Sequence, residues 1–185
     1  MNAVDIRLKA LLLVLALVIT IVLIVNFWPD EKAQQQTVVN EVSQKSKTII
    51  LFNNAVIDLR KHRFWQAIEG FRQVLKTAPT MPEAYVNIGF ANLELKQYEQ
   101  AKQAFNTALE LRAGQINAYW GLAVSLEGLC DIPTAIGAMK TYVHLAKKND
   151  PYLKKANAAL WEWDQQKKAA ELSGSNKMTC QPSSI

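Results

Sequence analysis

The feature that most constrains this chain is a set of apolar residues that recurs with a period of 34. Three separate positions follow that spacing, and chance rarely aligns three such sets. They are Phe64, Tyr98 and Ile132; Ala67, Ala101 and Ala135; and Phe71, Phe105 and Met139. A unit of about 34 residues holds two helices and a turn, and it cannot bury its apolar face alone, so copies stack into a solenoid. The sequence therefore predicts an all-α helical solenoid, an architecture that favours binding over catalysis.

The repeat divides the middle of the chain into three helix-turn-helix units. In the second unit, the turn between the two helices is expected near Lys96 and Gln97. Pro79 closes the second helix of the first unit, and Pro82 opens the next helix at a position where a missing backbone donor costs little. The predicted units cover residues 48–81, 82–115 and 116–149.

A further helix is predicted after the third unit, over residues 150–172. Tyr152 lies in the register of another first helix, but no second helix follows it, so this segment is interpreted as a cap on the stack. Trp161 and Trp163 cannot both face the stack, because successive residues of a helix diverge by about 100°. Residues 173–185 are predicted to form a disordered tail.

An apolar segment near the N-terminus, residues 10–28, follows a short segment of residues 1–9. It contains no charged residue, and its only polar side chains are those of Thr20 and Asn26. At about 1.5 Å per helical residue, its length matches the ~30 Å hydrocarbon core of a bilayer, which predicts a single transmembrane helix. A cleaved signal peptide is the alternative. Its apolar region is normally about 7–15 residues long and ends at a small-x-small cleavage site, and this segment shows no such site.

The charges that flank the apolar segment predict its orientation. Arg7 and Lys9 precede it, whereas acidic residues follow it directly, so the nearest basic residues favour a cytoplasmic N-terminus. Lys45 and Lys47 weaken that bias. We therefore expect a single-pass membrane protein with its repeats outside the cytoplasm, which in a bacterium means the inner membrane and the periplasm. Residues 29–47, which are polar and rich in glutamine, are predicted to form a partly helical stalk or a flexible tether.

The remaining composition argues against several classes of function. The net charge of +5 comes from scattered basic residues, which indicates a solvated helical surface and not a nucleic-acid-binding stripe. His62 and His144 are isolated, and the chain has no HExxH, glycine-rich phosphate loop or GxSxG motif, so no metal, cofactor or catalytic site is predicted. Cys130 and Cys180 follow no framework spacing, and unpaired or optionally paired thiols are favoured over a structural bridge.

These patterns resemble the tetratricopeptide repeat family over about residues 48–166. The second unit carries the family pattern best, with Tyr85, Ile88, Gly89, Tyr98, Ala101, Phe105 and Ala108. The third unit matches with Tyr119, Leu122, Ala123, Ala135 and Met139, and the first with Ala55, Phe64, Ala67, Phe71 and Pro79. The first unit has Leu51 where the family has an aromatic residue, and the third lacks the terminal proline. The resemblance implies three repeats and a capping helix behind a membrane anchor.

The resemblance also implies a binding groove, because proteins of this family bind peptides or partner helices along a concave surface lined by the first helices. By register, that groove would comprise Phe52, Val56, Glu83, Val86, Asn87, Phe90, Asn117, Trp120 and Val124. Family members that clamp a chaperone's C-terminal carboxylate carry lysine, arginine and asparagine at these positions, and here only Asn87 fits. An apolar groove rimmed by asparagine and glutamate favours an amphipathic helix or an apolar segment of a partner protein. The alternative is that Phe90 and Trp120 pack against neighbouring helices or against the stalk.

The resemblance implies a class of function and not a reaction. Membrane-anchored proteins with a few such repeats include scaffolds and assembly factors for cytochrome c, pili and other envelope complexes. The predicted partners are therefore a protein segment in the groove and the lipid bilayer around residues 10–28, with no nucleic acid. The alternative is a stable structural accessory subunit of a larger membrane complex. An enzymatic function is not predicted.

Overall fold

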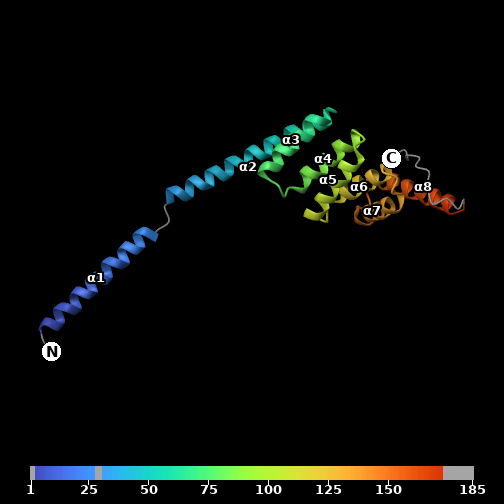
Figure 1. Ribbon diagram of the computed structural model, residues 1–185. Helices are drawn as coiled ribbons and strands as arrows, with labels where there is room; N and C mark the ends of the chain where they lie inside the picture. Colours follow the sequence, from blue (N-terminus) through green and yellow to red (C-terminus); the bar gives the residue numbers. More distant parts are fainter. Residues whose placement is uncertain (1–2, 28–30, 173–185) are drawn as a thin grey trace. The chain divides into compact units, whose positions relative to one another are not determined.

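The computed structural model of the chain describes residues 3–27 and 31–172, and these residues form helices and no strand (Figure 1). The helices in this part of the chain are α1 (Ala3–Phe27), α2 (Glu31–Arg60), α3 (Phe64–Thr77), α4 (Pro82–Glu94), α5 (Tyr98–Leu111), α6 (Ile116–Gly128), α7 (Ile132–Leu145) and α8 (Leu153–Leu172). The all-α prediction is confirmed. The chain divides into two compact parts, an N-terminal part up to Lys45 and a C-terminal part from Ser46 onward.

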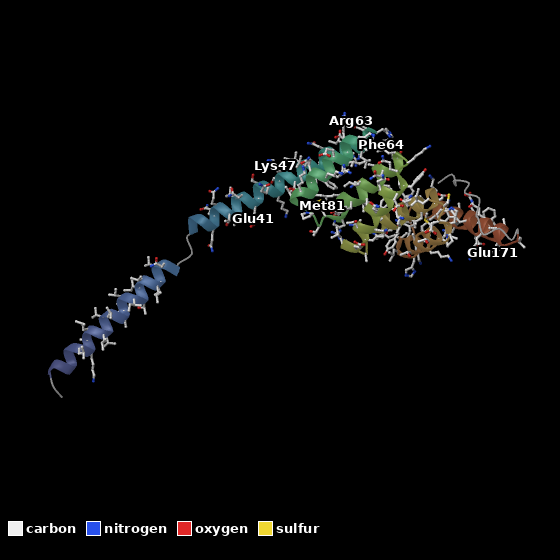
Figure 2. The ribbon with its side chains drawn as sticks, viewed as in Figure 1. Glu41, Lys47, Arg63, Phe64, Met81 and Glu171 are labelled. Carbon is white, nitrogen blue, oxygen red and sulfur yellow. The ribbon has the colours of Figure 1, made fainter. Side chains whose placement is uncertain are left out.

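The N-terminal part contains α1, in which residues Leu8–Asn26 have a mean hydropathy of 3.1. Their side chains project from the helix without being buried (Figure 2). The polar groups within the segment bond to their own helix, because the Thr20 hydroxyl donates to the carbonyl of Leu17 and the Asn26 amide to that of Val22, each at 2.8 Å. Such internal pairing is what hydrocarbon requires of polar groups. Helix α1 is long and apolar enough to cross a membrane, although a signal sequence near an N-terminus has the same character.

The segment predicted as a partly helical stalk or a flexible tether is helical from Glu31 onward. Helix α2 continues through Thr48, where the first repeat was expected to begin, and ends at Arg60. The physical reason is visible in the sequence, because α2 contains neither glycine nor proline to interrupt its hydrogen bonds. Stalk and first repeat helix are therefore one continuous element.

The C-terminal part is a stack in which each helix packs on its neighbours in the chain. Helices α3 and α4, α4 and α5, α5 and α6, α6 and α7, and α7 and α8 are in contact, and α4 also contacts α6 (Figure 1). The N-terminal side of the stack is closed by the second half of α2, where the hydroxyl of Thr48 lies 3.0 Å from that of Thr77 on α3. Contacts confined to neighbouring helices and successive first helices define a solenoid.

The turns inside the units share one backbone conformation. His62, Lys96 and Cys130 have φ angles of 58°, 56° and 65°, and they are 34 residues apart. Each residue therefore occupies the left-handed region as the first helix of its unit ends. The following amide returns to the helix, as when the Gln97 N–H donates to the Asn92 carbonyl at 2.8 Å. This is the hydrogen-bonding pattern of a helix whose C-terminus ends in a left-handed residue, and the turn expected near Lys96 and Gln97 is present.

The sequence favoured unpaired or optionally paired thiols over a structural bridge. Cys130 is exposed in the turn between α6 and α7, and it is disulfide-bonded. Of the states left open by the sequence, the paired one is therefore present in this structure. The other cysteine of the chain, Cys180, lies outside the described residues.

The core is built from large rings set against small residues. Phe105 of α5 is completely buried, and a Cβ atom on Gly89 or Gly121 would lie within 2.6 or 2.1 Å of its ring. The repeated alanines at positions 67, 101 and 135 are also completely buried. Because protein interiors are close-packed, each small residue leaves the volume that a neighbouring ring fills. The three recurring registers therefore describe one packing scheme.

The stack ends at α8, which packs on α7. Trp163 is completely buried, and its indole Nε1–H donates to Oε1 of Glu127 on α6 at 2.9 Å. Trp161 remains 66% exposed, as the helical geometry of this pair requires. The predicted tail, residues 173–185, lies outside the described residues.

Candidate partner-binding groove

The residues predicted for the groove come from the first helix of each unit. Phe52 and Val56 lie on α2, and the other residues lie on α4 and α6, which contact each other. The α4 residues are Glu83, Val86, Asn87 and Phe90, and the α6 residues are Asn117, Trp120 and Val124. The structure gives these residues different surroundings, so they do not form one uniform surface.

A pocket brings three of these residues together. Phe90, Asn117 and Trp120 line a cavity of about 230 Å³ with Tyr142 of α7 and Tyr152, which lies just before α8. Phe90 and Trp120 are half-buried, whereas Asn117 is exposed. The pocket therefore lies where the second unit, the third unit and the cap meet.

The sequence-based groove omitted Tyr142 and Tyr152. Tyr142 belongs to a second helix, whereas the groove was assigned only to first helices. A signal was nevertheless present, because Tyr142 occupies the register of Ala108 and Val74 and is much larger than either. Tyr152 was placed in the register of another first helix, and the structure puts it at the edge of the pocket, 55% exposed.

The aromatic rings of the pocket are steeply inclined to one another. The ring of Trp120 lies 5.2 Å from that of Tyr142, with an angle of 69° between their planes, and 5.7 Å from that of Tyr152, with an angle of 56°. Phe90 packs at 75° against the buried ring of Phe105, at 5.1 Å. These inclined contacts are favourable for aromatic pairs. Phe90 and Trp120 thus contact the core and line the pocket at the same time.

Both tyrosines of the pocket form a hydrogen bond to the carboxylate of Asp150. The hydroxyl of Tyr142 donates to Oδ1 of Asp150 at 2.8 Å, and the backbone N–H of Tyr152 donates to the same oxygen at 2.8 Å. Burial raises the pKa of Tyr142 far above its ordinary value, and the neighbouring carboxylate raises it further. The Tyr142 phenol is therefore a neutral, fixed donor, and Asp150 positions both tyrosines.

Glu83 and Asn87, two of the polar groove residues, have partners on the protein. The Glu83 carboxylate accepts from Arg112 at 2.5 Å and from Gln115 at 3.1 Å, and it thereby joins the start of α4 to the loop after α5. Burial acts to raise the pKa of Glu83, but hydrogen bonds from its own backbone, Arg112 and Gln115 outweigh it, so the pKa is lowered. The Asn87 amide donates to the Glu83 carbonyl at 2.8 Å. Glu83 therefore has a structural role.

The apolar groove residues outside the pocket are mainly packing residues. Val86 is only 7% exposed and belongs to the core around Phe105, because α4 turns this side chain towards α5 and α6. Phe52 packs edge-on against Phe71 at 5.4 Å, and Val56 packs against the same core cluster. Val124 is half-buried. The open part of the predicted groove is therefore concentrated at Phe90, Asn117 and Trp120.

A second hollow lies on α3, α4 and α5, away from these residues. Its volume is about 520 Å³, and its lining includes Trp65, Arg72 and several glutamine side chains such as that of Gln100. Trp65 is 60% exposed. Within the described residues, no group of three or more His, Cys, Asp or Glu side chains is arranged to hold a metal ion. Trp65 provides a comparison site for tests of the pocket.

Stacked helix pairs with a pocket between successive first helices define a class of protein, the helical-repeat solenoids, whose fold is a protein-interaction module. Residues 59–126 match the model of the tetratricopeptide repeat family. The resemblance to tetratricopeptide repeats and the solenoid fold predicted from the sequence are confirmed.

Solved structures support the same fold at low sequence identity. The tetratricopeptide repeat domain of Arabidopsis OM64 is 18% identical, with a TM-score of 0.61 over 66% of this chain and 98% of that one. The Sgt2 domain of Aspergillus fumigatus is 16% identical, with a TM-score of 0.63 over 70% of this chain and 84% of that one. The second such domain of human RPAP3, solved with the HSP70 peptide SGPTIEEVD, is 17% identical, with a TM-score of 0.59 over 65% and 98%. No curated protein matches the sequence.

Proposed function

We propose that this chain is a membrane-anchored scaffold or assembly factor, and not an enzyme, that binds a peptide or an amphipathic helix of a partner protein. The observation that carries this proposal is the pocket between the second and third units. There, Phe90 and Trp120 keep part of their aromatic surface open beside the exposed amide of Asn117. Apolar surface next to a few polar groups suits the apolar face of a helix.

The structural neighbours support a peptide as the class of ligand. The human RPAP3 domain was solved with an HSP70 peptide whose sequence ends in EEVD, which carries three acidic side chains. In this chain, none of the described residues that line the pocket is a cation. The proposed partner segment is therefore different from an acidic chaperone tail, and apolar side chains provide its main contacts.

The proposed place of action is a membrane surface. The apolar segment Leu8–Asn26 would anchor the chain, and the preceding residues Arg7 and Lys9 favour a cytoplasmic N-terminus. The repeats would then lie outside the cytoplasm, in the periplasm if the source is a bacterium. Assembly of cytochrome c, of pili or of another envelope complex is the kind of process in which such a protein would present a partner segment.

A photo-crosslinking experiment tests the groove. A photoreactive amino acid replaces Asn117 in the full-length protein, and a matched protein carries it at Trp65, which is exposed in the other hollow. We expect the probe at position 117 to capture a defined partner segment in native membranes, identified by mass spectrometry. Trp120→Asp should abolish that crosslink because it places a charge among apolar rings, whereas Trp65→Asp should preserve it.

Two controls separate binding from folding. Circular dichroism must show unchanged helicity for each variant, and Asn117→Arg offers a second lesion at an exposed position that cannot disturb the core. Because the probe occupies position 117, Asn117→Arg is scored by copurification of the partner that the crosslink identified. If folded Trp120→Asp keeps the crosslink and folded Asn117→Arg still copurifies that partner, the groove proposal is wrong. Partners that copurify at constant stoichiometry with every variant would instead identify a structural accessory subunit.

A further inference from the structure

The pocket contains more aromatic surface than an apolar groove needs. Among the five described residues that line it, four are aromatic, namely Phe90, Trp120, Tyr142 and Tyr152. Tyr142 and Tyr152 both lie within 6 Å of Trp120, measured between ring centroids, at plane angles of 69° and 56°. Rings inclined in this way leave several faces and edges open to one cavity. In parallel stacking, the faces would instead cover one another.

Aromatic faces attract cations. The face of an aromatic ring carries negative charge density, and a cation within about 6 Å of the ring centroid is stabilised, most strongly by tryptophan and tyrosine. The hydrogen bond from the Tyr142 hydroxyl to Asp150 should add to this effect, because donation to a carboxylate polarises the phenol. Asp150 itself contributes a negative charge at the hydroxyl end of the Tyr142 side chain. Among the described residues, none of those lining the pocket is a lysine or an arginine that would oppose a bound cation.

The volume of the pocket suits a single side-chain group and not a drug-sized molecule. At about 230 Å³, the cavity is smaller than the roughly 300–1,000 Å³ of sites for drug-sized molecules. Of the described residues that line it, Asn117 is the only non-aromatic one, and its carbonyl oxygen can accept a hydrogen bond. An ammonium group is compact and carries three donors, so it can use this acceptor while it faces the rings.

We propose that the pocket is an aromatic cage for the ammonium group of a lysine in the partner segment. This inference rests on the proposed function and adds the chemistry of the anchor residue. The partner segment then carries a lysine within its apolar face, with the ammonium group against Trp120 and Tyr152 and the methylene stem along Phe90. The charge of the partner is thus opposite to that of an acidic tail.

The test uses small probes and the full-length protein in lipid nanodiscs. The tryptophans are labelled with 5-fluorotryptophan, and Trp→Phe variants assign the five resonances. The probes are blocked single residues, N-acetyl-lysine methylamide and N-acetyl-norleucine methylamide, which differ by the charged amino group. We expect the lysine probe to shift the Trp120 resonance and to bind on the order of tenfold more tightly than the norleucine probe. The Trp65 resonance should remain unchanged.

Substitutions at Tyr152 provide the matched variants, because this side chain is 55% exposed and its loss does not open the core. Tyr152→Leu keeps apolar bulk but removes the ring, so it should reduce the preference for lysine severalfold. Tyr152→Phe keeps the ring and should preserve that preference.

Three results would overturn the cage. They are equal or tighter binding of the norleucine probe, no shift of Trp120 with either probe, and tighter binding of the corresponding arginine derivative. A norleucine preference together with an intact crosslink at position 117 would reject the cage and leave the proposed function standing. Lysine binding without any crosslinked partner would reject the proposed function alone.

Discussion

At the scale of single residues, the most regular feature of the molecule is the left-handed conformation of His62, Lys96 and Cys130. A left-handed backbone costs an L-residue roughly 1–2 kcal/mol, and glycine is the usual residue there. The 34-residue period predicted where these turns lie. It could not predict the sign of φ, because histidine is enriched at positive φ but lysine and cysteine are not, so the three residue types share no signal. The conformation is imposed by the returning hydrogen bonds of the next residue, as at Gln97.

Replacement of one of these residues by glycine should stabilise the fold. Lys96→Gly removes the Cβ strain at φ 56°, although the more flexible unfolded chain offsets part of the gain, so we expect a net increase of about 0.5–1 kcal/mol. Chemical denaturation followed by circular dichroism measures this change. Lys96→Ala is the control, since it removes the same charged chain but keeps the Cβ. Equal stability of the two variants would show that the turn is not strained.

At the scale of helices, packing depends on the close approach of α4 and α6 to the ring of Phe105 on α5. The approach is possible because Gly89 and Gly121 lack a side chain at the contact. Gly137 of α7 differs, because a Cβ atom placed there would meet nothing within 4 Å. Gly121 and Gly137 thus differ in the space around them: a side chain at position 121 would clash with Phe105, whereas one at position 137 would meet no other atom.

We expect Gly121→Ala and Gly137→Ala to change stability in opposite directions. At position 121 the added methyl group would lie 2.1 Å from the Phe105 ring, and relief of that clash should cost about 1–3 kcal/mol. At position 137, alanine relieves the poor helix propensity of glycine and should stabilise the protein by about 0.5–1 kcal/mol. Thermal melts of both variants decide the matter. A neutral or stabilising Gly121→Ala would mean that α6 and α5 are less tightly packed than described.

The helical elements were more predictable than the pocket. Periodicity indicates which side of a helix faces the core, so the registers of Phe71, Phe105 and Met139 led directly to completely buried side chains. Periodicity does not indicate how deeply a side chain is buried. Val86 was assigned to the groove, but it is buried in the core. Periodicity also says little about residues that depart from the repeat, such as Tyr142, although the departure itself was the useful signal. The continuity of α2 was missed because the change from polar to apolar residues was interpreted as the end of the stalk.

At the scale of the whole molecule, the repeat stack needs an end, and α8 provides it. Trp163 covers the last unit and bonds to Glu127, so the terminal helix is fixed by a buried polar contact as well as by apolar area. Its neighbour Trp161 faces outward. In a stack whose contacts are local, loss of the cap should weaken the adjacent unit first.

Trp163→Phe should loosen the cap selectively. The variant removes the indole donor to Glu127, which for a buried hydrogen bond to a charged group corresponds to about 1.5–3 kcal/mol, in addition to lost packing. Hydrogen exchange should accelerate in α8 and α7 before it changes in α4. Trp161→Phe, at a site 66% exposed, is the matched control and should leave exchange unchanged. Uniform acceleration along all helices would show that the stack unfolds as a single cooperative unit.

The position of Phe105 between Gly89 of its own repeat and Gly121 of the next also bears on how such a chain can change over evolutionary time. The contact spans the junction between two copies, so an insertion or deletion preserves it only when it leaves α4, α5 and α6 in their present registers. A residue added or lost within one of these helices would set the ring against a side chain instead of against a glycine. Descendants of this chain are therefore expected to vary in length in the loops between the helices and to keep the helices themselves at constant length.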